Sequence, residues 1–193
     1  MNTDQIWTYL QDHNYFLHHK LYNKFEVIQP AYVDLVDIKD KVILDIGCGF
    51  GRNLSWFSQY ASRCIGIEVT PKIIKEARDF ITKTGNIKKV RILLSSDYEK
   101  YLSSLDYVFC RFVFQHINKE KCREYIKNIN KFLKIEGKIN LQFRLGNLTK
   151  IENNKEPVVE YTLEEIDILL ENFEINDMKV HGNQVYIIGT KLI

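Results

Sequence analysis

The sequence from residue 41 to residue 53 reads Lys41-Val-Ile-Leu-Asp-Ile-Gly-Cys-Gly-Phe-Gly-Arg-Asn53, and this stretch decides the fold class. Its first half, residues 41–46, is short, rich in β-branched residues and largely apolar, which is typical of a strand buried on both faces of a parallel sheet. Three glycines end this strand, and residues 51–60 then have the pattern of a helix. The sequence therefore predicts a strand, a glycine loop and a helix in direct succession.

The alternation of strands and helices continues along the chain. Further strands are predicted at residues 63–68, 90–94, 105–110 and 138–143, and helices at residues 71–83, 119–134 and 163–172. Thr70 is the expected cap of the first of these helices, and Thr162-Leu-Glu-Glu165 is a capping box that opens the last one. Residues 173–180 and 185–192, joined by a Gly-Asn turn, predict a hairpin. Such alternation indicates an open parallel sheet with helices on both faces.

Length and composition indicate one globular domain. The chain has 193 residues, of which residues 41–193 are expected to form the core and residues 1–40 a helical cap rich in aromatic side chains. The net charge of +2 is too small to suggest nucleic-acid binding. Neither a secretory signal nor an apolar run of membrane-spanning length is found, and the four cysteines form no C-x-x-C pair. We therefore expect a cytoplasmic protein that neither spans a membrane nor binds nucleic acid.

The glycine loop has the chemistry of a ligand site. Glycine lets the backbone approach a ligand closely, and the helix that follows offers free N–H groups and a positive dipole end. A dinucleotide fingerprint, G-x-G-x-x-G, needs its third glycine at Arg52, so the spacing departs from the NAD pattern. Glu68 ends the second strand roughly 20 residues later, where a carboxylate can bind ribose hydroxyls. Asp97 follows the third strand and can accept a hydrogen bond from an adenine amine.

In order along the chain, these motifs resemble those of class I S-adenosylmethionine (SAM)-dependent methyltransferases. The residues that carry the resemblance are Asp45-Ile-Gly-Cys-Gly-Phe-Gly51, Glu68 in Gly-Ile-Glu, Asp97 before Tyr98, and Leu105-Asp-Tyr-Val-Phe-Cys-Arg-Phe-Val-Phe-Gln-His-Ile117. Leu133-Lys-Ile-Glu-Gly-Lys138 resembles the family's turn Leu-Lys-Pro-Gly-Gly, with Ile135-Glu136 in place of Pro-Gly. The resemblance covers residues 41–193. It implies an α/β, Rossmann-like, doubly wound sheet of seven strands, mostly parallel, with an antiparallel strand from the C-terminal hairpin.

The resemblance also implies a cofactor site for SAM. Gly47 and Gly49 are expected to approach its methionine part, together with the other loop residues Cys48, Gly51 and Asn53, while Asp45 orients its amino group. Glu68 is expected to hold the ribose, Val69 to pack on the adenine, and Asp97 with Tyr98 to recognise it. Cys110 is expected to contribute backbone near the methionine end.

His116 follows the fourth strand at a position where many members of this family carry a histidine near the substrate. One interpretation is a general base, because an ordinary histidine pKa suits proton removal near neutral pH. The other is a histidine at a helix start that only binds backbone. Related quinone-precursor O-methyltransferases use two Glu beside this histidine for a metal. Phe112 and Gln115 take those positions here, so we expect no metal.

Arg111 and Arg144 end the fourth and fifth predicted strands, and Arg52 follows the glycine loop. The crevice of such a sheet opens at this edge, so we expect Arg111 and Arg144 to bind a carboxylate or phosphate of the acceptor. The alternative is that these arginines pair with acidic neighbours such as Asp45, Glu68 or Asp97, or face water.

With neither a large insertion after the fifth strand nor an appended RNA-binding module, the sequence favours a small, anionic acceptor over RNA or protein. Two other functions stay open. A nicotinamide-dependent oxidoreductase is disfavoured by the glycine spacing and the terminal hairpin, and a non-catalytic SAM-binding partner subunit is disfavoured by the intact motif set. The oligomeric state, the acceptor and the methylated atom are left undetermined.

Overall fold

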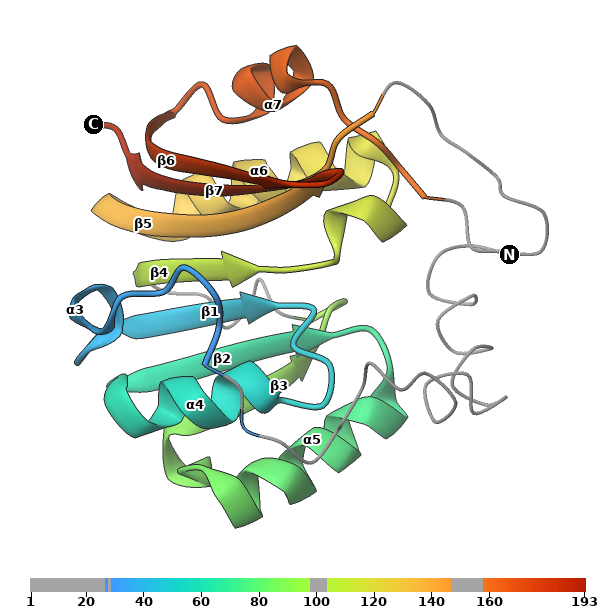
Figure 1. Ribbon diagram of the computed structural model, residues 1–193. Helices are drawn as coiled ribbons and strands as arrows, with labels where there is room; N and C mark the ends of the chain where they lie inside the picture. Colours follow the sequence, from blue (N-terminus) through green and yellow to red (C-terminus); the bar gives the residue numbers. More distant parts are fainter. Residues whose placement is uncertain (1–26, 28, 98–103, 147–157) are drawn as a thin grey trace.

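The computed structural model describes residues 27, 29–97, 104–146 and 158–193 (Figure 1). The predicted helical cap of residues 1–40 lies mostly outside these residues, which include only one short helix of it, α3 (Leu35–Ile38). No helix in the described part of the chain is long and apolar enough to cross a membrane.

The described elements follow the predicted alternation. The strands are β1 (Val42–Ile46), β2 (Arg63–Glu68), β3 (Val90–Leu94), β4 (Leu105–Cys110), β5 (Leu133–Arg144), β6 (Phe173–His181) and β7 (Gln184–Lys191). The longer helices are α4 (Arg52–Tyr60), α5 (Pro71–Thr84), α6 (Lys119–Phe132) and α7 (Leu163–Leu169). Two short 3-10 helices, η1 (Ile87–Lys89) and η3 (Phe114–His116), complete the set.

The seven strands form one sheet in the order β3-β2-β1-β4-β5-β7-β6. The pairs from β3 to β5 are parallel, and β7 lies antiparallel between β5 and β6, so the predicted Rossmann-like sheet is confirmed. The chain winds outward from β1 to β3 and then returns to place β4 on the other side of β1. Strand order therefore reverses between β1 and β4, where sheets of this kind bind ligands.

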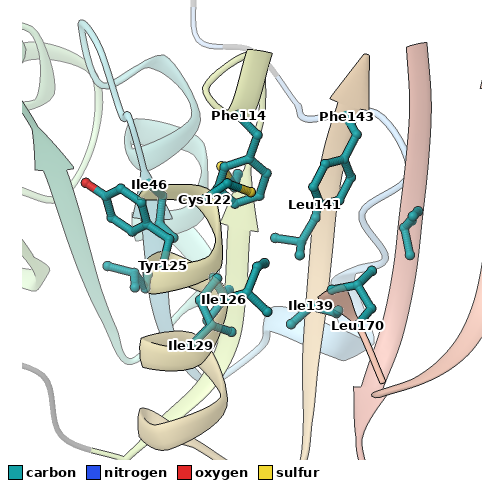
Figure 2. Close-up of a cluster of buried hydrophobic side chains, with 14 of the residues drawn as sticks. Ile46, Phe114, Cys122, Tyr125, Ile126, Ile129, Ile139, Leu141, Phe143 and Leu170 are labelled. Carbon is teal, nitrogen blue, oxygen red and sulfur yellow. The ribbon is translucent and has the colours of Figure 1, made fainter. Parts of the chain in front are cut away.

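A hydrophobic core lies on each face of the sheet, as the doubly wound prediction requires. Helices α3, α4 and α5 cover one face and enclose side chains such as Phe57, Tyr107 and Phe109. Helices α6 and α7 pack on the other face, where Figure 2 shows Phe114 beside Cys122 of α6, with Ile126 and Ile129 further along that helix and Phe143 on β5. Adjacent residues of one strand, such as Val108 and Phe109, enter opposite cores because side chains alternate across a strand.

Two boundaries differ from the predictions by three residues or more, and one expected helix cap is missing. β5 begins at Leu133, directly after α6, and the predicted turn is an irregularity within the strand in which Glu136 takes a left-handed φ of 61°. α7 ends at Leu169 rather than at residue 172. Thr70 does occupy the N-cap position of α5, but its side chain makes no capping hydrogen bond, so the expected side-chain cap is absent.

The capping box of α7 gives a test of local stability. Thr162 accepts a hydrogen bond from the backbone N–H of Glu165, and the Glu165 carboxylate accepts one from the N–H of Thr162. We predict that Thr162→Ala lowers the free energy of unfolding by about 1 kcal/mol, because one helical N–H loses its acceptor. Urea denaturation measures the change. Thr162→Ser keeps the hydroxyl and is expected to retain most of the stability; equal losses in both variants would contradict the capping role.

Candidate functional site

A cavity of about 460 Å³ opens at the carboxyl ends of β1, β2 and β4, which is within the usual size range for small-molecule sites. The glycine loop, the end of β2 and the segment after β4 provide most of its wall. Its lining residues are Pro30, Ala31, Ile46, Gly47, Cys48, Gly49, Phe50, Arg52, Asn53, Ile67, Glu68, Val69, Ile73, Ser95, Phe109, Arg111, Phe112, Val113, His116, Ile117, Tyr125 and Tyr186.

The glycine loop turns the chain from β1 into α4 through three left-handed residues. Gly47, Gly49 and Gly51 have φ values of 67°, 52° and 78°. A Cβ at Gly47 would lie 2.3 Å from a methyl carbon of Val113, whereas a Cβ at Gly49 would meet nothing within 4 Å. Because Gly49 also lines the cavity, the space beside it is room for a ligand.

Glu68 ties the end of β2 to this loop. One carboxylate oxygen accepts hydrogen bonds from the backbone N–H groups of Val69 (2.8 Å) and Thr70 (3.2 Å), and the other accepts from the N–H of Gly49 (3.1 Å). Gly66, one residue inside the same strand, leaves space for the loop. A Cβ there would come within 2.8 Å of the sulfur of Cys48.

Asp45 is a buried carboxylate at the base of the loop, only 1% exposed. Burial, and secondarily the charge of Glu68, raise the pKa of Asp45 well above its ordinary value. Its Oδ2 atom has no hydrogen-bond partner among the described residues. Asp45 itself does not line the cavity. A buried acceptor without a partner is costly, so a cationic or hydrogen-donating ligand group would be favoured near it.

The structure places some of the remaining predicted cofactor residues in the cavity wall and others outside it. Asn53 and Val69 line the cavity together with Gly47, Cys48, Gly49 and Glu68. Gly51 serves as the N-cap of α4, while Cys110 is fully buried at the end of β4, and Asp97 follows β3 outside the lining. Tyr98 lies outside the described residues.

Arg111 lies in the cavity wall with its guanidinium among aromatic rings. Its Cζ is 4.4 Å from the ring centre of Tyr186 and 5.2 Å from that of Phe109. Nη2 donates hydrogen bonds to the carbonyl of Ala31 and to the amide oxygen of Asn140. Nη1 is buried and has no hydrogen-bond partner among the described residues. Burial lowers the pKa of Arg111 to about 10, so the group still carries its charge at neutral pH.

Arg144 does not join Arg111 in the cavity lining. Its Nε lies 3.3 Å from a carboxylate oxygen of Glu160, which is only 8% exposed. This is the internal ion pairing that the sequence left open as the alternative, although the partner is an acidic residue that the sequence analysis did not consider. Arg52 does line the cavity.

His116 also lines the cavity, at the end of η3. Its Nε2 lies 2.9 Å from the side-chain nitrogen of Gln115. The backbone N–H of His116 donates to the carbonyl of Val113. The histidine thus lines the cavity at the end of its own 3-10 turn, and its side chain contacts the Gln115 amide.

Sequence reasoning missed the residues that reach the cavity from distant strands. Tyr186 arrives from β7, where its backbone lies opposite Gln142 of β5, and Ala31 comes from the segment before α3. Only the register of the hairpin brings Tyr186 over Arg111, so no local motif predicts it. No group of three metal-ligating side chains occurs in the described ranges, and the absence of a metal stays a prediction.

The comparison with protein families identifies the domain. Residues 43–137 match a family model described as a methyltransferase domain. This part of the chain is a methyltransferase domain, consistent with the class I SAM-dependent family that the motifs resemble. The match spans β1 to the start of β5 and thus includes the glycine loop, Glu68 and Arg111.

Curated relatives match about half of the chain. The chain is 31% identical over 99 residues to an uncharacterized protein of Rickettsia prowazekii, and 28% identical over 98 residues to an uncharacterized methyltransferase, YcgJ, of Bacillus subtilis. The matches cover 49% and 50% of this chain but only 39% and 38% of those proteins. The chain therefore matches about two fifths of the length of these relatives.

Solved structures share the whole fold. Magnesium protoporphyrin IX methyltransferase of Synechocystis, crystallised with bound SAM, superposes with a TM-score of 0.71 at 14% identity, over 99% of this chain and 98% of that one. Phosphoethanolamine N-methyltransferase 1 of Haemonchus contortus, in complex with phosphoethanolamine and S-adenosylhomocysteine (SAH), gives a TM-score of 0.65 at 16% identity, over 80% and 39%. At these identities the likeness establishes the methyltransferase fold.

The raised pKa of Asp45 predicts a pH dependence of stability. The folded chain retains a proton on Asp45 at pH values where the unfolded chain, with an ordinary aspartate pKa near ~3.9, has lost it. The stability contributed by this group therefore falls as pH rises above that ordinary value. Between that ordinary pKa and the raised pKa of folded Asp45, we predict that the stability of Asp45→Asn relative to wild type increases by about 1.4 kcal/mol per pH unit, the slope for one proton.

Urea denaturation of the ligand-free proteins across acidic to neutral pH measures this difference. Taking the difference between variant and wild type cancels the other titrating groups, such as Asp106. Burial raises the pKa of Asp106, but the hydrogen bonds from Lys134 and the N–H of Val42, together with nearby lysine charges, lower it overall. A difference that stays constant with pH would contradict the buried, protonated state of Asp45.

Proposed function

We propose that this chain binds SAM in the cavity between β1 and β4 and transfers its methyl group to a small acceptor that carries a carboxylate or phosphate. The observation that carries the cofactor assignment is the pair of carboxylates, Asp45 and Glu68, beside a glycine loop that leaves open space at Gly49. The observation that carries the acceptor class is Nη1 of Arg111, which is buried in the same cavity wall and has no partner within the described ranges.

The charges around the loop fit SAM better than a dinucleotide. Asp45 and Glu68 interact closely enough for the charge of Glu68 to raise the pKa of Asp45. A ligand with an ammonium group relieves this repulsion, whereas the pyrophosphate of NAD would add to it. The N-terminus of α4, capped by a glycine without a side-chain hydrogen bond, offers backbone N–H groups to a carboxylate. This distribution supports SAM over the nicotinamide alternative.

Bound SAM supplies a methyl group on a positively charged sulfur, which a nucleophile displaces in line. The residues of this chain have to place the acceptor, exclude water and control its protons. Arg111 is suited to the first task, because a guanidinium binds both oxygens of a carboxylate or phosphate. A second positive charge near a sulfonium is repulsive, and an anionic acceptor between them compensates it. Among the described residues His116 is the one histidine in the lining and is suited to the third task.

The rival that stays open is a SAM-binding subunit without activity of its own. Binding and turnover distinguish the two, because both functions require the cofactor site and only the enzyme requires the acceptor site. The first experiment therefore tests the cofactor, and the second tests the acceptor.

We predict that SAH binds with a dissociation constant on the order of micromolar and that NAD gives no measurable heat in calorimetric titration. Gly49→Val is expected to weaken SAH binding at least tenfold. Its side chain would occupy the open space at the cavity, and a β-branched residue is strained at a φ of 52°.

The matched control is Gly182→Val, a glycine with a φ of 59° and equally open surroundings in the β6–β7 turn, far in sequence from the loop. It carries the same backbone strain but is expected to keep wild-type SAH affinity. Binding of NAD without SAH, or equal losses in both variants, would refute the proposed cofactor site.

For the acceptor, we predict that SAH is produced with carboxylated or phosphorylated metabolites and not with their neutral analogues. Arg111→Met is expected to lower kcat/KM for such an acceptor about 10- to 100-fold, which corresponds to about 1.5–3 kcal/mol for one charged hydrogen bond. Its affinity for SAH is expected to stay within about twofold of wild type, a difference well under the 1.4 kcal/mol of a tenfold change.

Arg144→Met is the comparison variant, because Arg144 pairs with Glu160 and does not line the cavity. It is expected to retain kcat/KM. Wild-type kcat/KM in Arg111→Met would show that the acceptor does not need this arginine, and loss of SAH binding would assign Arg111 to the cofactor instead.

A further inference from the structure

A chain of side-chain amides connects the middle of the sheet to His116. It starts at the backbone N–H of Phe112, which donates a hydrogen bond to Oε1 of Gln142. A backbone N–H can only donate, so this bond fixes which end of the Gln142 amide is oxygen. Gln142 is 1% exposed, on β5, and has little freedom to turn its amide toward solvent.

The fixed orientation of the Gln142 amide determines the orientation of the Gln115 amide next to it. Nε2 of Gln142 faces three acceptors: the side-chain oxygen of Gln184 on β7, the carbonyl of Phe143 (3.2 Å) and Oε1 of Gln115 (3.5 Å). The contact to Gln115 is the longest of the three and weak as a hydrogen bond. Rotating the Gln115 amide by half a turn would nevertheless place its nitrogen against Nε2 of Gln142, so that two donors face each other. The oxygen of Gln115 therefore stays toward Gln142, and its nitrogen stays toward His116.

The orientation of the Gln115 amide determines which ring nitrogen of His116 carries the proton. The amide nitrogen of Gln115 lies 2.9 Å from Nε2 of His116, and an amide nitrogen has no acceptor capacity. Nε2 must therefore accept, which in a neutral imidazole leaves the proton on Nδ1. We propose that Gln115 and Gln142 are positioning residues that hold His116 as its Nδ1–H tautomer.

The proposal refines the role of His116 in methyl transfer, and in that part it rests on the proposed function. While Gln115 donates to Nε2, the lone pair of that nitrogen is occupied and the other nitrogen carries a proton. The neutral ring then acts on an acceptor as a hydrogen-bond donor and not as a general base. Acceptors that need no base, such as an oxygen that is already ionised, match this state.

The tautomer can be measured without an acceptor or a cofactor. In ¹⁵N-labelled protein the protonated and unprotonated ring nitrogens of neutral histidines have well-separated shifts, and their couplings to the ring protons tell Nδ1 from Nε2. The spectrum is recorded in mildly alkaline buffer, where imidazole is neutral. His116→Phe assigns the signal among the five histidines of the chain. We expect His116 to be the Nδ1–H tautomer.

Gln115→Glu is the decisive variant. It replaces the amide donor with a carboxylate that only accepts, so the proton is expected to move to Nε2 and the tautomer to reverse. Gln115 is half-buried, and the change adds almost no volume. Gln59→Glu on the exposed side of α4 introduces the same charge elsewhere and is expected to leave the tautomer unchanged.

An Nε2–H tautomer in the wild-type protein, or an unchanged tautomer in Gln115→Glu, would overturn the proposal. Reversal in the Gln59→Glu control would overturn it as well, because the effect would then be one of net charge. Should Gln115→Glu fail to fold, Gln115→Met removes the donor without adding charge, and a loss of the Nδ1–H preference is expected. SAH titration of the same samples tests the proposed function separately, since the amide chain includes none of the cofactor residues.

Discussion

Three left-handed backbone conformations within five residues, at Gly47, Gly49 and Gly51, are the constraint on which the rest of the site depends. They turn the chain from β1 into α4 in a space closed by Val113 on one side and Ile81 on the other. Any side chain at the first or third position would collide with these residues, and one at the second would enter the cavity. The turn therefore brings the N-terminus of α4 and the end of β1 to the same opening, which fixes where a ligand carboxylate and a ligand cation are accommodated.

Buried charges then give the cavity its electrostatic character. The carboxyl groups of Asp45 and Glu68 lie beside the glycine loop, with burial favouring the protonated form of Asp45, and Arg111 after β4 adds a positive group whose Nη1 has no partner in the described structure. Each of these arrangements costs stability in the free protein, because buried charges and unsatisfied donors are unfavourable. A ligand that satisfies both ends would regain that free energy on binding. Costly groups of this kind concentrate at functional sites, and here they lie at the point where strand order reverses.

Most of the fold could be predicted from the sequence because the signals are local. The bounds of β2, β3 and β4 coincide with the predicted runs, and the capping box of α7 follows from four adjacent residues. The failures are places where tertiary contacts override local preference. Glu136 takes a left-handed conformation inside β5, where the family's turn carries glycine, and nothing in a propensity scale predicts that. The side chain of Thr70 makes no capping hydrogen bond, and at this end of α5 the N–H groups of Val69 and Thr70 donate to Glu68.

The two halves of the candidate site differ in how far a sequence can reveal them. The cofactor half is built from β1, the loop and the end of β2, within residues 45–69, so its motif is contiguous. The acceptor half is assembled from β4, β5, β7 and the segment before α3. Asn140, buried on β5, shows the difference: it accepts from Arg111 and donates to the carbonyl of Tyr32 and the hydroxyl of Tyr107. Its role requires three partners, 29 to 108 residues away, which only strand register brings together. Changes in these distant residues leave the glycine loop intact, so the acceptor can differ between proteins that share one cofactor site.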